Sequence, residues 1–319
     1  MGKRRIAISM FSAGVMAVIA STAFGQNYPN KPIRIFTTPA GGGNDFSARI
    51  VANGISGPLG QSVLVENRPT KLVGEIVSKA QPDGYSLLLA GSSISITPLL
   101  EKTGYDPVKD FAPIAMVDTT PSILVVHPSL PVRSVNNLIA LAKARPGELN
   151  YGSGGIGSAN HLATELFKAI AKVNIVNVSY KGSGPAMAAL ISGEIQLMIP
   201  NVGAVTPHLK SGRLRALAVG SATPSELAPG LPTMAASGVP GYDAASLHIL
   251  LAPASTPAAI INRLNQEVVR LLHRAEVKQR LLSSGVEPLG SSPEELGAYI
   301  KADIAKWGKV IKEAGIRAD

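Results

Sequence analysis

The fold class is decided by the stretch IRIFTTPAGGGNDF, residues 33–46. Its first part, 33–37, is an apolar run of the length of a buried strand. The glycines that follow predict a tight turn. The spacing of the apolar residues after them predicts a helix that begins near Phe46. A strand, a glycine-rich turn and a helix in this order form the repeating unit of α/β folds.

The same alternation continues along the chain. Helical periodicity returns between the apolar runs, for example at 162–170. The buried strands are predicted at 33–37, 86–90, 123–126, 195–199 and 216–219. We therefore predict an α/β fold with largely parallel sheets and helices on their faces.

The C-terminal segment is predicted to be helical, with a defined start and stop. Ser292 and Glu295 have the spacing of a capping box, and Pro293 suits the first helical position. Trp307, the single tryptophan of the chain, lies on the apolar stripe of this helix. It is therefore predicted to be a core residue and not a platform for a ligand. Gly315 is the predicted stop.

Residues 1–25 have the order of a secretory signal peptide. Three basic residues at 3–5 precede an apolar stretch, and small residues at Ala23 and Gly25 end the segment. The alternative is a membrane anchor, but the apolar stretch is shorter than the ~20 residues that a spanning helix needs. We expect secretion, cleavage and a mature chain of 26–319.

Composition narrows the class of partner. The formal charge is +9, and removing the three basic residues at 3–5 leaves +6, which favours anionic partners through the long-range field. The basic residues are scattered and aromatic residues make up only 4%, so we expect no nucleic acid partner. The chain has no cysteine, which excludes a disulfide, a thiolate metal site and a lipid-modified cysteine.

Two glycine-rich turns occupy the same setting in the chain. They are PAGGGND at 39–45 and GSGGIGS at 152–158, and each follows an apolar run and precedes a predicted helix. The start of a helix offers unpaired N–H groups and the positive end of the helix dipole. Glycine lets a ligand come close to these groups, and Ser153 and Ser158 add hydroxyl donors. Both turns are therefore candidate anion sites.

The alternative for either cluster is a plain turn. Asn44 or Asp45 is expected to cap its helix and not to contact an anion. Two such turns, in a chain long enough for two domains, favour two lobes that share a cleft. An anion held between the two helix ends would draw the lobes together. We therefore predict an anion site in a cleft between two lobes.

Catalytic and cofactor motifs are not supported. The segment GSGGIG at 152–157 matches the dinucleotide fingerprint, but no acid follows about 20 residues later, where such sites bind the ribose. The five histidines lack a metal-binding spacing, and no G-x-S-x-G elbow occurs. A hydrolase built on Ser158, His161 and Glu165 is an alternative, but their closeness would be a local coincidence on one helix start. We expect no cofactor, no metal site and no enzyme activity.

Further motifs extend over 28–316 and together resemble one known family. In the first half they are YPNKPIR at 28–34, GGGND at 41–45, VENRP at 65–69, PDGY at 82–85, YDP at 105–107 and DFAP at 110–113. In the second half they are LNY at 149–151, GS at 157–158, HL at 161–162, YKGS at 180–183, PH at 207–208, GRLRALA at 212–218 and LAP at 251–253. Their order and spacing resemble the substrate-binding receptors of tripartite tricarboxylate transporters, also called the Bug family.

The resemblance implies the two-lobed fold of periplasmic binding proteins, the Venus flytrap, with each lobe a sheet flanked by helices. Lobe 1 would comprise 26–124 and 250–319, and lobe 2 would comprise 125–249, with crossing strands near 122–127 and 247–253. The resemblance also implies a periplasmic, monomeric receptor that holds a small carboxylate through backbone amides, hydroxyls and water. Its partners would be the membrane permease subunits of the transporter. The alternative is a receptor that reports to a signalling protein.

The ligand-binding residues that the resemblance implies come from loops of both lobes. They are Gly41, Gly42, Asn44, Asp45, Ser92 and Ser93 in the first lobe, and Ser153, Ile156, Gly157, Ser158, His161, Pro200 and Asn201 in the second. Some positions near the expected cleft depart from the family's usual residues. The loop after Pro69 is short, Ile156 and Pro200 stand where polar or acidic residues are usual, and Leu247-His248 replaces a commoner aromatic pair.

Overall fold

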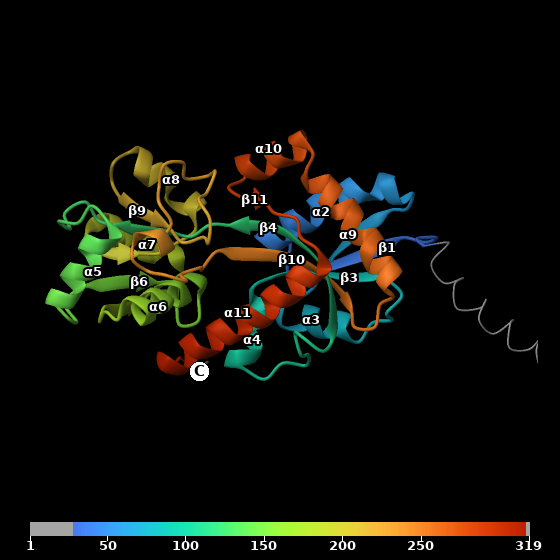
Figure 1. Cartoon of the computed structure of the whole chain (residues 1–319), viewed down its shortest axis with the longest axis horizontal. Coiled ribbons are helices and arrows are strands. Elements are labelled where there is room, and N and C mark those ends of the chain that lie inside the picture. Colours follow the sequence, from blue (N-terminus) through green and yellow to red (C-terminus); the bar gives the residue numbers. More distant parts are fainter. Residues whose placement is uncertain (1–27, 317–319) are drawn as a thin grey trace, which may run out of the picture.

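The computed structural model describes residues 28–316, so the predicted signal peptide lies outside the described part of the chain. Figure 1 shows two lobes side by side along the long axis, each built around its own sheet. The larger sheet has six strands and the smaller has five. The predicted two-lobed α/β fold, with each lobe a sheet flanked by helices, is confirmed. Within residues 28–316, no helix has the length and apolar character needed to cross a bilayer.

The larger sheet takes its strands from both the first and the last third of the chain. The strands lie in the order β11-β4-β10-β3-β1-β2. β1 pairs in parallel with β2 and β3, whereas β10 runs antiparallel to β3 and β4. The bounds are Ile33–Thr37 for β1, Val63–Asn67 for β2, Ser86–Gly91 for β3, Phe111–Thr120 for β4, Ser246–Pro253 for β10 and Glu287–Pro288 for β11.

The smaller sheet is formed by the middle of the chain. Its strands lie in the order β7-β6-β8-β5-β9. β6 pairs in parallel with β7 and β8, and β5 runs antiparallel to β8 and β9. The bounds are Ile123–Val126 for β5, Asn150–Ser153 for β6, Val176–Ser179 for β7, Leu197–Met198 for β8 and Arg215–Val219 for β9.

Both sheets are mixed, which corrects the prediction of largely parallel sheets. Parallel strands follow one another through a helix that returns the chain to the same end of the sheet. β4 and β5 instead carry the chain from one lobe to the other, and β10 brings it back. β4 ends at Thr120 and β5 begins at Ile123, so two residues separate strands of different sheets. The direction of these strands is therefore set by the crossing, and their neighbours pair with them antiparallel.

The two crossings are hydrogen-bonded to each other through one glycine. Gly220 N donates to Ser122 O over 2.8 Å, and Ala244 N donates to Gly220 O over 2.8 Å. Ser122 lies on the first crossing, and Ala244 lies two residues before the start of β10 on the second. A Cβ atom on Gly220 would collide with Ser122 Oγ, so glycine permits this close approach.

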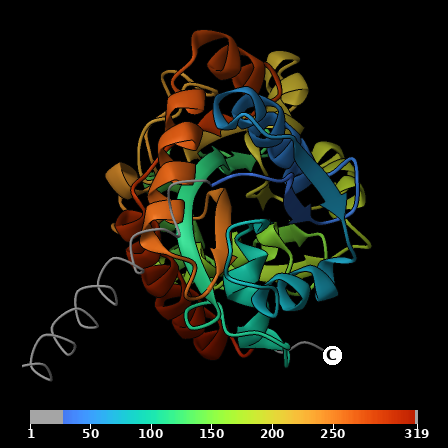
Figure 2. The same ribbon diagram turned by 90° about the vertical axis from the view of Figure 1, so that its right-hand side faces the viewer.

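Helices cover both faces of the larger sheet, as the end-on view in Figure 2 shows. Ile35 and Phe36 are neighbours on β1 and point to opposite faces, as the period of a strand requires. Ile35 packs with α2, α9 and α10, and Phe36 packs with α3, α4 and the start of α11. The bounds are Gly43–Leu59 for α2, Thr70–Ser78 for α3, Ser93–Leu100 for α4, Ala258–Leu272 for α9, Ala275–Ser283 for α10 and Pro293–Glu313 for α11.

The smaller sheet is covered in the same way. Leu124 faces a core shared with α5 and α6, and its neighbour Ile123 faces a core shared with α7 and α8. The bounds are Val135–Ala144 for α5, Ala159–Ala171 for α6, Ser183–Ser192 for α7 and Val202–Lys210 for α8. Each lobe therefore has its own buried core on both faces of its sheet.

The C-terminal helix α11 links the two lobes (Figure 1). Its first part contributes Leu296 to the core of the larger lobe, and its last part contributes Trp307 to the core of the smaller lobe. The predicted capping box is confirmed, since Glu295 N donates to Ser292 Oγ over 3.1 Å and Ser292 N donates to Glu295 Oε2 over 2.7 Å. The prediction that Trp307 is a core residue is also confirmed, because it is 6% exposed.

Candidate functional site

A cavity of about 460 Å³ lies between the lobes. Its wall combines the first turn of α2, the loop between β3 and α4, the turn before α6, the start of α8 and the crossing strand β10. The lining residues are Thr38, Gly43, Asn44, Gly91, Ser92, Ser93, Ile96, Thr97, Leu100, Thr120, Gly157, Ala159, Leu162, Asn201, Ser246, Leu247 and His248. A ligand in this cavity would touch both lobes and one of the segments that join them.

Helix α2 begins at the wall of this cavity. Gly42 is its N-cap, and the first-turn residues Gly43 and Asn44 line the cavity. The first N–H groups of a helix have no acceptor within the helix, so they are available to an anion. The helix starts earlier than the predicted Phe46, which places glycine in its first turn. Gly41 has a φ of +87° and does not line the cavity.

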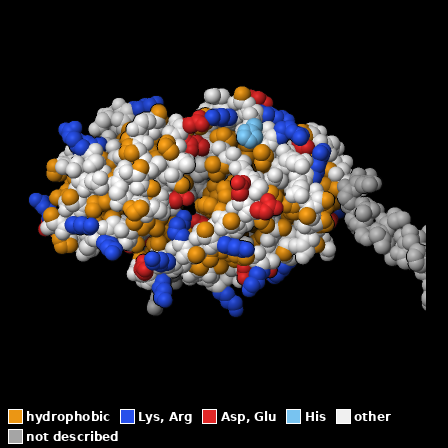
Figure 3. All heavy atoms as spheres, viewed as in Figure 1, with side chains coloured by type: hydrophobic (Ala, Val, Ile, Leu, Met, Phe, Trp, Pro, Cys, Tyr) orange, Lys and Arg blue, Asp and Glu red, His pale blue; other side chains and the backbone are white. Residues whose placement is uncertain are grey.

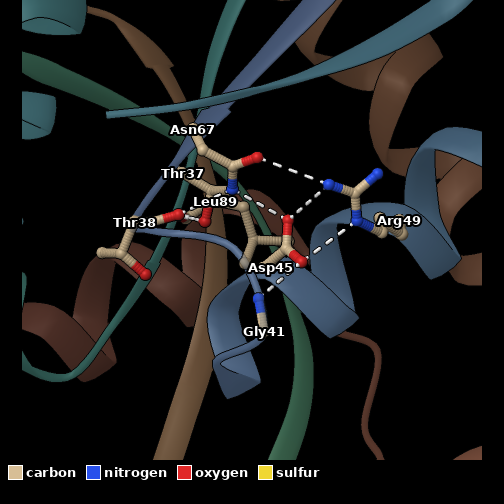
Figure 4. Close-up of polar contacts among 7 residues, drawn as sticks. All are labelled: Thr37, Thr38, Gly41, Asp45, Arg49, Asn67 and Leu89. Atoms are coloured by element: carbon tan, nitrogen blue, oxygen red, sulfur yellow. Dashed lines mark hydrogen bonds and ion pairs between the residues drawn. The ribbon is translucent and has the colours of Figure 1, made fainter. Parts of the chain in front are cut away.

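Asp45 is not among the lining residues and instead fixes the turn beside them (Figure 4). Its carboxylate accepts hydrogen bonds from Arg49 Nε over 3.0 Å, from Asn67 Nδ2 over 2.8 Å and from Gly41 N over 3.1 Å. The bond from Arg49 above all, with those from Asn67 and Gly41, lowers the pKa of Asp45 to about 2 despite its burial. Asp45 is therefore an internal anchor that holds the start of α2 in place.

The loop between β3 and α4 brings two serines to the cavity. Ser92 and Ser93 both line it. Ser92 Oγ also accepts a hydrogen bond from Leu247 N over 3.1 Å, which joins this loop to the crossing strand β10. The position of Ser92 is thus coupled to the segment that connects the lobes.

A second cavity of about 350 Å³ adjoins the first within the larger lobe. The two cavities share the lining residues Thr38, Asn44, Ser93 and Thr97. The second is closed on one side by α3. This helix begins at Thr70 directly after Pro69, so the loop between β2 and α3 is short. Lys71 Nζ bonds Glu101 Oε2 over 3.1 Å across its wall. The interlobe cavity therefore has room to extend towards α3.

The second glycine-rich turn reaches the cavity through a single one of its predicted residues. Gly157 lines the cavity with a φ of +76°, and its N–H donates to His161 Nδ1 over 3.1 Å. Ser158 is the N-cap of α6, but its Oγ lies 2.6 Å from Gly155 O and 2.7 Å from Asn160 Oδ1. The hydroxyl of Ser158 is thus engaged within its own turn.

The remaining predicted residues of the smaller lobe, apart from Asn201, do not line the cavity. Ser153 is fully buried, and its Oγ has no hydrogen-bond partner among the described residues. Ile156 is 57% exposed. His161 is buried, and desolvation lowers the pKa of its imidazole. Pro200 O accepts a hydrogen bond from Ile123 N over 2.9 Å. Its neighbour Asn201 lies at the cavity wall.

The structure thus brings together some of the predicted site residues and not others. Asn44, Ser92, Ser93, Gly157 and Asn201 meet at one cavity. The others are outside its lining: Gly41, Gly42, Asp45, Ser153, Ile156, Ser158, His161 and Pro200.

His248 lines the cavity and was not among the predicted site residues. Its Nδ1 lies 2.5 Å from Asp118 Oδ1 and 3.2 Å from Ser47 Oγ. The sequence signal for His248 was a histidine inside an otherwise apolar strand. A buried polar side chain in such a run needs a partner, and this requirement could have flagged it.

The alternative of a hydrolase centred on Ser158 finds no support in the geometry. Ser158 Oγ is bonded within its own turn, and His161 Nδ1 accepts from Gly157 N. Glu165 Oε1 bonds Tyr151 Oη and Lys168 Nζ, each over 2.6 Å. The three side chains therefore form no proton relay. Across residues 28–316, no group of three histidine, aspartate or glutamate side chains could hold a metal ion.

Charge is distributed without a single dominant patch on the face that Figure 3 shows. Lys and Arg side chains are scattered there over both lobes, whereas most of the Asp and Glu side chains in view lie towards the middle and over the larger lobe. An anion would therefore be held by local groups in the cavity, such as helix N–H groups and hydroxyls, and not by a basic surface on this face.

Comparison with known proteins identifies relatives over almost the whole chain. Residues 47–316 match the family model described as "Tripartite tricarboxylate transporter family receptor". The chain is 35% identical to protein BugT of Bordetella pertussis over 319 residues, which cover 98% of this chain and 97% of BugT. It is also 32% identical to a protein from the tcbD-tcbE intergenic region of Pseudomonas sp. strain P51, over 100% of this chain and 96% of that protein.

Three solved structures are informative. The R. palustris protein Rpa4515 with adipate is 38% identical, with a TM-score of 0.70 over 91% of this chain and 99% of that chain. MatC from Rhodopseudomonas palustris with bound malate is 26% identical, with a TM-score of 0.66 over 89% of this chain and 100% of that chain. A TctC solute-binding protein from Polaromonas, with no ligand, is 26% identical, with a TM-score of 0.81 over 90% of this chain and 99% of that chain.

Proposed function

The chain belongs to the tripartite tricarboxylate transporter receptor family, and on that basis we propose that it captures a small carboxylate between its lobes for delivery to membrane permease subunits. The family assignment confirms the resemblance inferred from the sequence motifs. Members of this family are periplasmic solute-binding proteins, and relatives of known structure carry adipate or malate. Transport, and not catalysis, is the proposed role of the cavity.

The observation that carries the proposal is the wall of the interlobe cavity. The start of α2 supplies N–H groups, and Ser92, Ser93 and Thr38 supply hydroxyls. Gly157 and Asn201 supply the opposite wall from the smaller lobe. Such a set of short donors suits a carboxylate, whose oxygens accept several hydrogen bonds at once.

The proposed receptor works by closing around its ligand. The overlap with the Polaromonas protein with no ligand, at a TM-score of 0.81, exceeds that with the more similar protein bound to adipate, at 0.70. This difference is expected if the chain has the lobe arrangement of an unliganded receptor. A ligand that contacts both lobes would then favour the closed arrangement through its differential affinity.

Export to the periplasm is part of the proposal. The segment 1–25 has the order of a signal peptide. Mass spectrometry of the periplasmic protein should find an N-terminus at Gln26 or within a few residues of it. A functional protein that keeps Met1 would contradict cleavage.

The binding function is tested by thermal unfolding with malate, succinate, glutarate and adipate. A ligand at 100 times its Kd should stabilise the protein by about 2.7 kcal/mol, provided that the unfolded chain does not bind it. Delivery is tested in cells with the ligand so identified. Deleting the gene should abolish uptake of that ligand, whereas a sensing receptor would leave uptake intact once the permease is expressed from an inducible promoter.

A further inference from the structure

Asp118 and His248 form a pair on neighbouring strands at the floor of the interlobe cavity. β4 and β10 are antiparallel, and Asp118 is the register partner of His248. Asp118 Oδ1 lies 2.5 Å from His248 Nδ1, and the side chain of Asp118 is fully buried. The histidine side chain keeps 11% of its surface exposed and lines the cavity. The pair thus connects a buried carboxylate to the place where a ligand would lie.

The partners of Asp118 are few for a buried carboxylate. Its Oδ2 is buried without a hydrogen-bond partner among the described residues. A buried, ionised carboxylate is costly unless a positive charge or several donors face it. His248 is the recorded partner of Asp118 that can carry a positive charge. Asp118 Oδ1 therefore engages Nδ1 of His248, which leaves Nε2 as the ring nitrogen that can face a ligand.

The other edge of the His248 ring is turned towards the start of α2. A Cβ atom on Gly43 would lie 3.1 Å from Cε1 and 3.2 Å from Nε2 of His248. Gly43 is in the first turn of α2, lines the cavity, and shares that wall with Asn44. Within residues 28–316 no hydrogen-bond partner of Nε2 is recorded. In its charged form the ring presents an N–H from Nε2 beside the free N–H groups of the helix.

We propose that His248 binds a ligand carboxylate through Nε2–H as an imidazolium, so that capture of the anion is coupled to uptake of a proton. The ring would then lie between two carboxylates, that of Asp118 at Nδ1 and that of the ligand at Nε2. The inference rests on the proposed function, because it requires a carboxylate in the interlobe cavity. It adds a charged donor to a site whose other donors are neutral. Affinity should therefore rise as the pH falls.

The neighbouring polar groups, taken in turn, place no second charge on the His248 ring among the described residues. Ser47 of α2 contributes a neutral hydroxyl. Asp45 and Arg49, on the same helix, form an ion pair with each other. On β11, which pairs with β4 beside Asp118, Glu287 Oε1 bonds Ser225 Oγ over 2.6 Å.

The experiment is isothermal titration calorimetry of the mature protein with malate, succinate, glutarate and adipate, each in buffers of different ionisation enthalpy. Measured from pH 6 to pH 9, the number of protons taken up should rise towards one with pH. The Kd should rise by up to tenfold per pH unit over the same range. Above about pH 7 both carboxyl groups of each ligand are almost fully ionised, so a proton taken up there must go to the protein. Binding without proton uptake at any pH in this range contradicts the inference and leaves the proposed function intact. If none of the four binds, the proposed function and this inference fail together.

Two variants locate the proton, with a third as control. His248→Gln keeps a neutral donor, and it should weaken binding about tenfold to a hundredfold and abolish proton uptake. Asp118→Asn removes the carboxylate at Nδ1 but keeps the histidine, and it should weaken binding. The control is His127→Gln, whose Nδ1 bonds Ser129 Oγ over 2.7 Å outside the cavity, and it should change neither quantity. Calorimetry of the unmodified protein tests the inference by itself, so the test remains valid even if a variant unfolds. Proton uptake that persists in a folded His248→Gln variant excludes His248.

Discussion

The side-chain amide of Asn67 donates to Asp45 over 2.8 Å, and this bond joins the end of β2 to the turn that begins α2. The same amide also donates to Thr38 O over 2.7 Å, next to the cavity. Two loops of the larger lobe are therefore held to one buried carboxylate (Figure 4). This network fixes where α2 starts, and so places its first turn at the cavity wall.

Replacing Asp45 with Asn should lower the free energy of unfolding by about 1–3 kcal/mol at pH 7, because charged hydrogen bonds are lost. The pKa of Asp45 is lowered to about 2, below the ~3.9 of an unfolded aspartate. Its contribution is therefore present above pH 4 and is lost as the pH falls towards 2. Urea unfolding at pH 7, 4 and 3 measures it. The control is Asp83→Asn, which removes an exposed ion pair with Lys31 and should cost less than about 1 kcal/mol. Equal losses in the two variants would contradict the role of Asp45.

Replacing Gly157 with Val should weaken ligand binding strongly. A β-branched side chain would enter the cavity, where its Cβ would lie 3.4 Å from Leu100 Cδ1, and the φ of +76° would strain the turn. The strain is controlled by Gly212→Val, since Gly212 has a φ of +69° with open space around it and does not line the cavity. Calorimetry and urea unfolding on both variants separate the effects. We expect the two variants to lose similar stability, and only Gly157→Val to bind the ligand more weakly. Unchanged affinity in Gly157→Val would remove this turn from the site.

Replacing Ser158 with Ala should mainly affect stability. The hydroxyl bonds Gly155 O and Asn160 Oδ1 within the turn, so its loss should cost about 1 kcal/mol of folding free energy. Affinity for a confirmed ligand should change little. Calorimetry measures the affinity of the Ser158→Ala variant, and urea unfolding measures its stability. A loss of affinity of tenfold or more, with stability unchanged, would show that Ser158 contacts the ligand.

Ligand binding should make the molecule more compact. A ligand in the interlobe cavity would contact both lobes, which are joined by the crossings at Ser122 and Ala244. Such a ligand should favour closure of the lobes. Small-angle scattering should show a smaller radius of gyration at saturation with a carboxylate that binds. An unchanged radius at saturation would indicate a receptor that is closed beforehand.

Local patterns were sufficient to predict much of the architecture. β1 lies at Ile33–Thr37 as its apolar run predicted, and the capping box of Ser292 starts α11 as expected. The predicted strand at 195–199 is shorter, with Leu197–Met198 paired as β8. Its length was misjudged because Ile195 and Ile199 are buried in the lobe cores without extending the ladder. Burial alone does not distinguish a strand from a buried loop.

The site was predicted less completely, for physical reasons that two residues illustrate. Glycine-rich turns can be recognised in a sequence. Whether the hydroxyl of Ser158 faces a ligand or its own turn depends on nearby acceptors such as Asn160 Oδ1. His248 meets Asp118 across 130 residues of sequence through the pairing of β10 with β4. Local periodicity does not specify such a cross-strand pair.

The central claim is that a small carboxylate binds in the interlobe cavity. Its most direct test is calorimetric titration of the mature protein with malate, succinate, glutarate and adipate, repeated on the Gly157→Val variant. The account predicts saturable binding of at least one of them at one site per chain, with the affinity greatly reduced in the variant. The account is contradicted if none of these carboxylates binds, or if the variant binds as tightly as the unmodified protein.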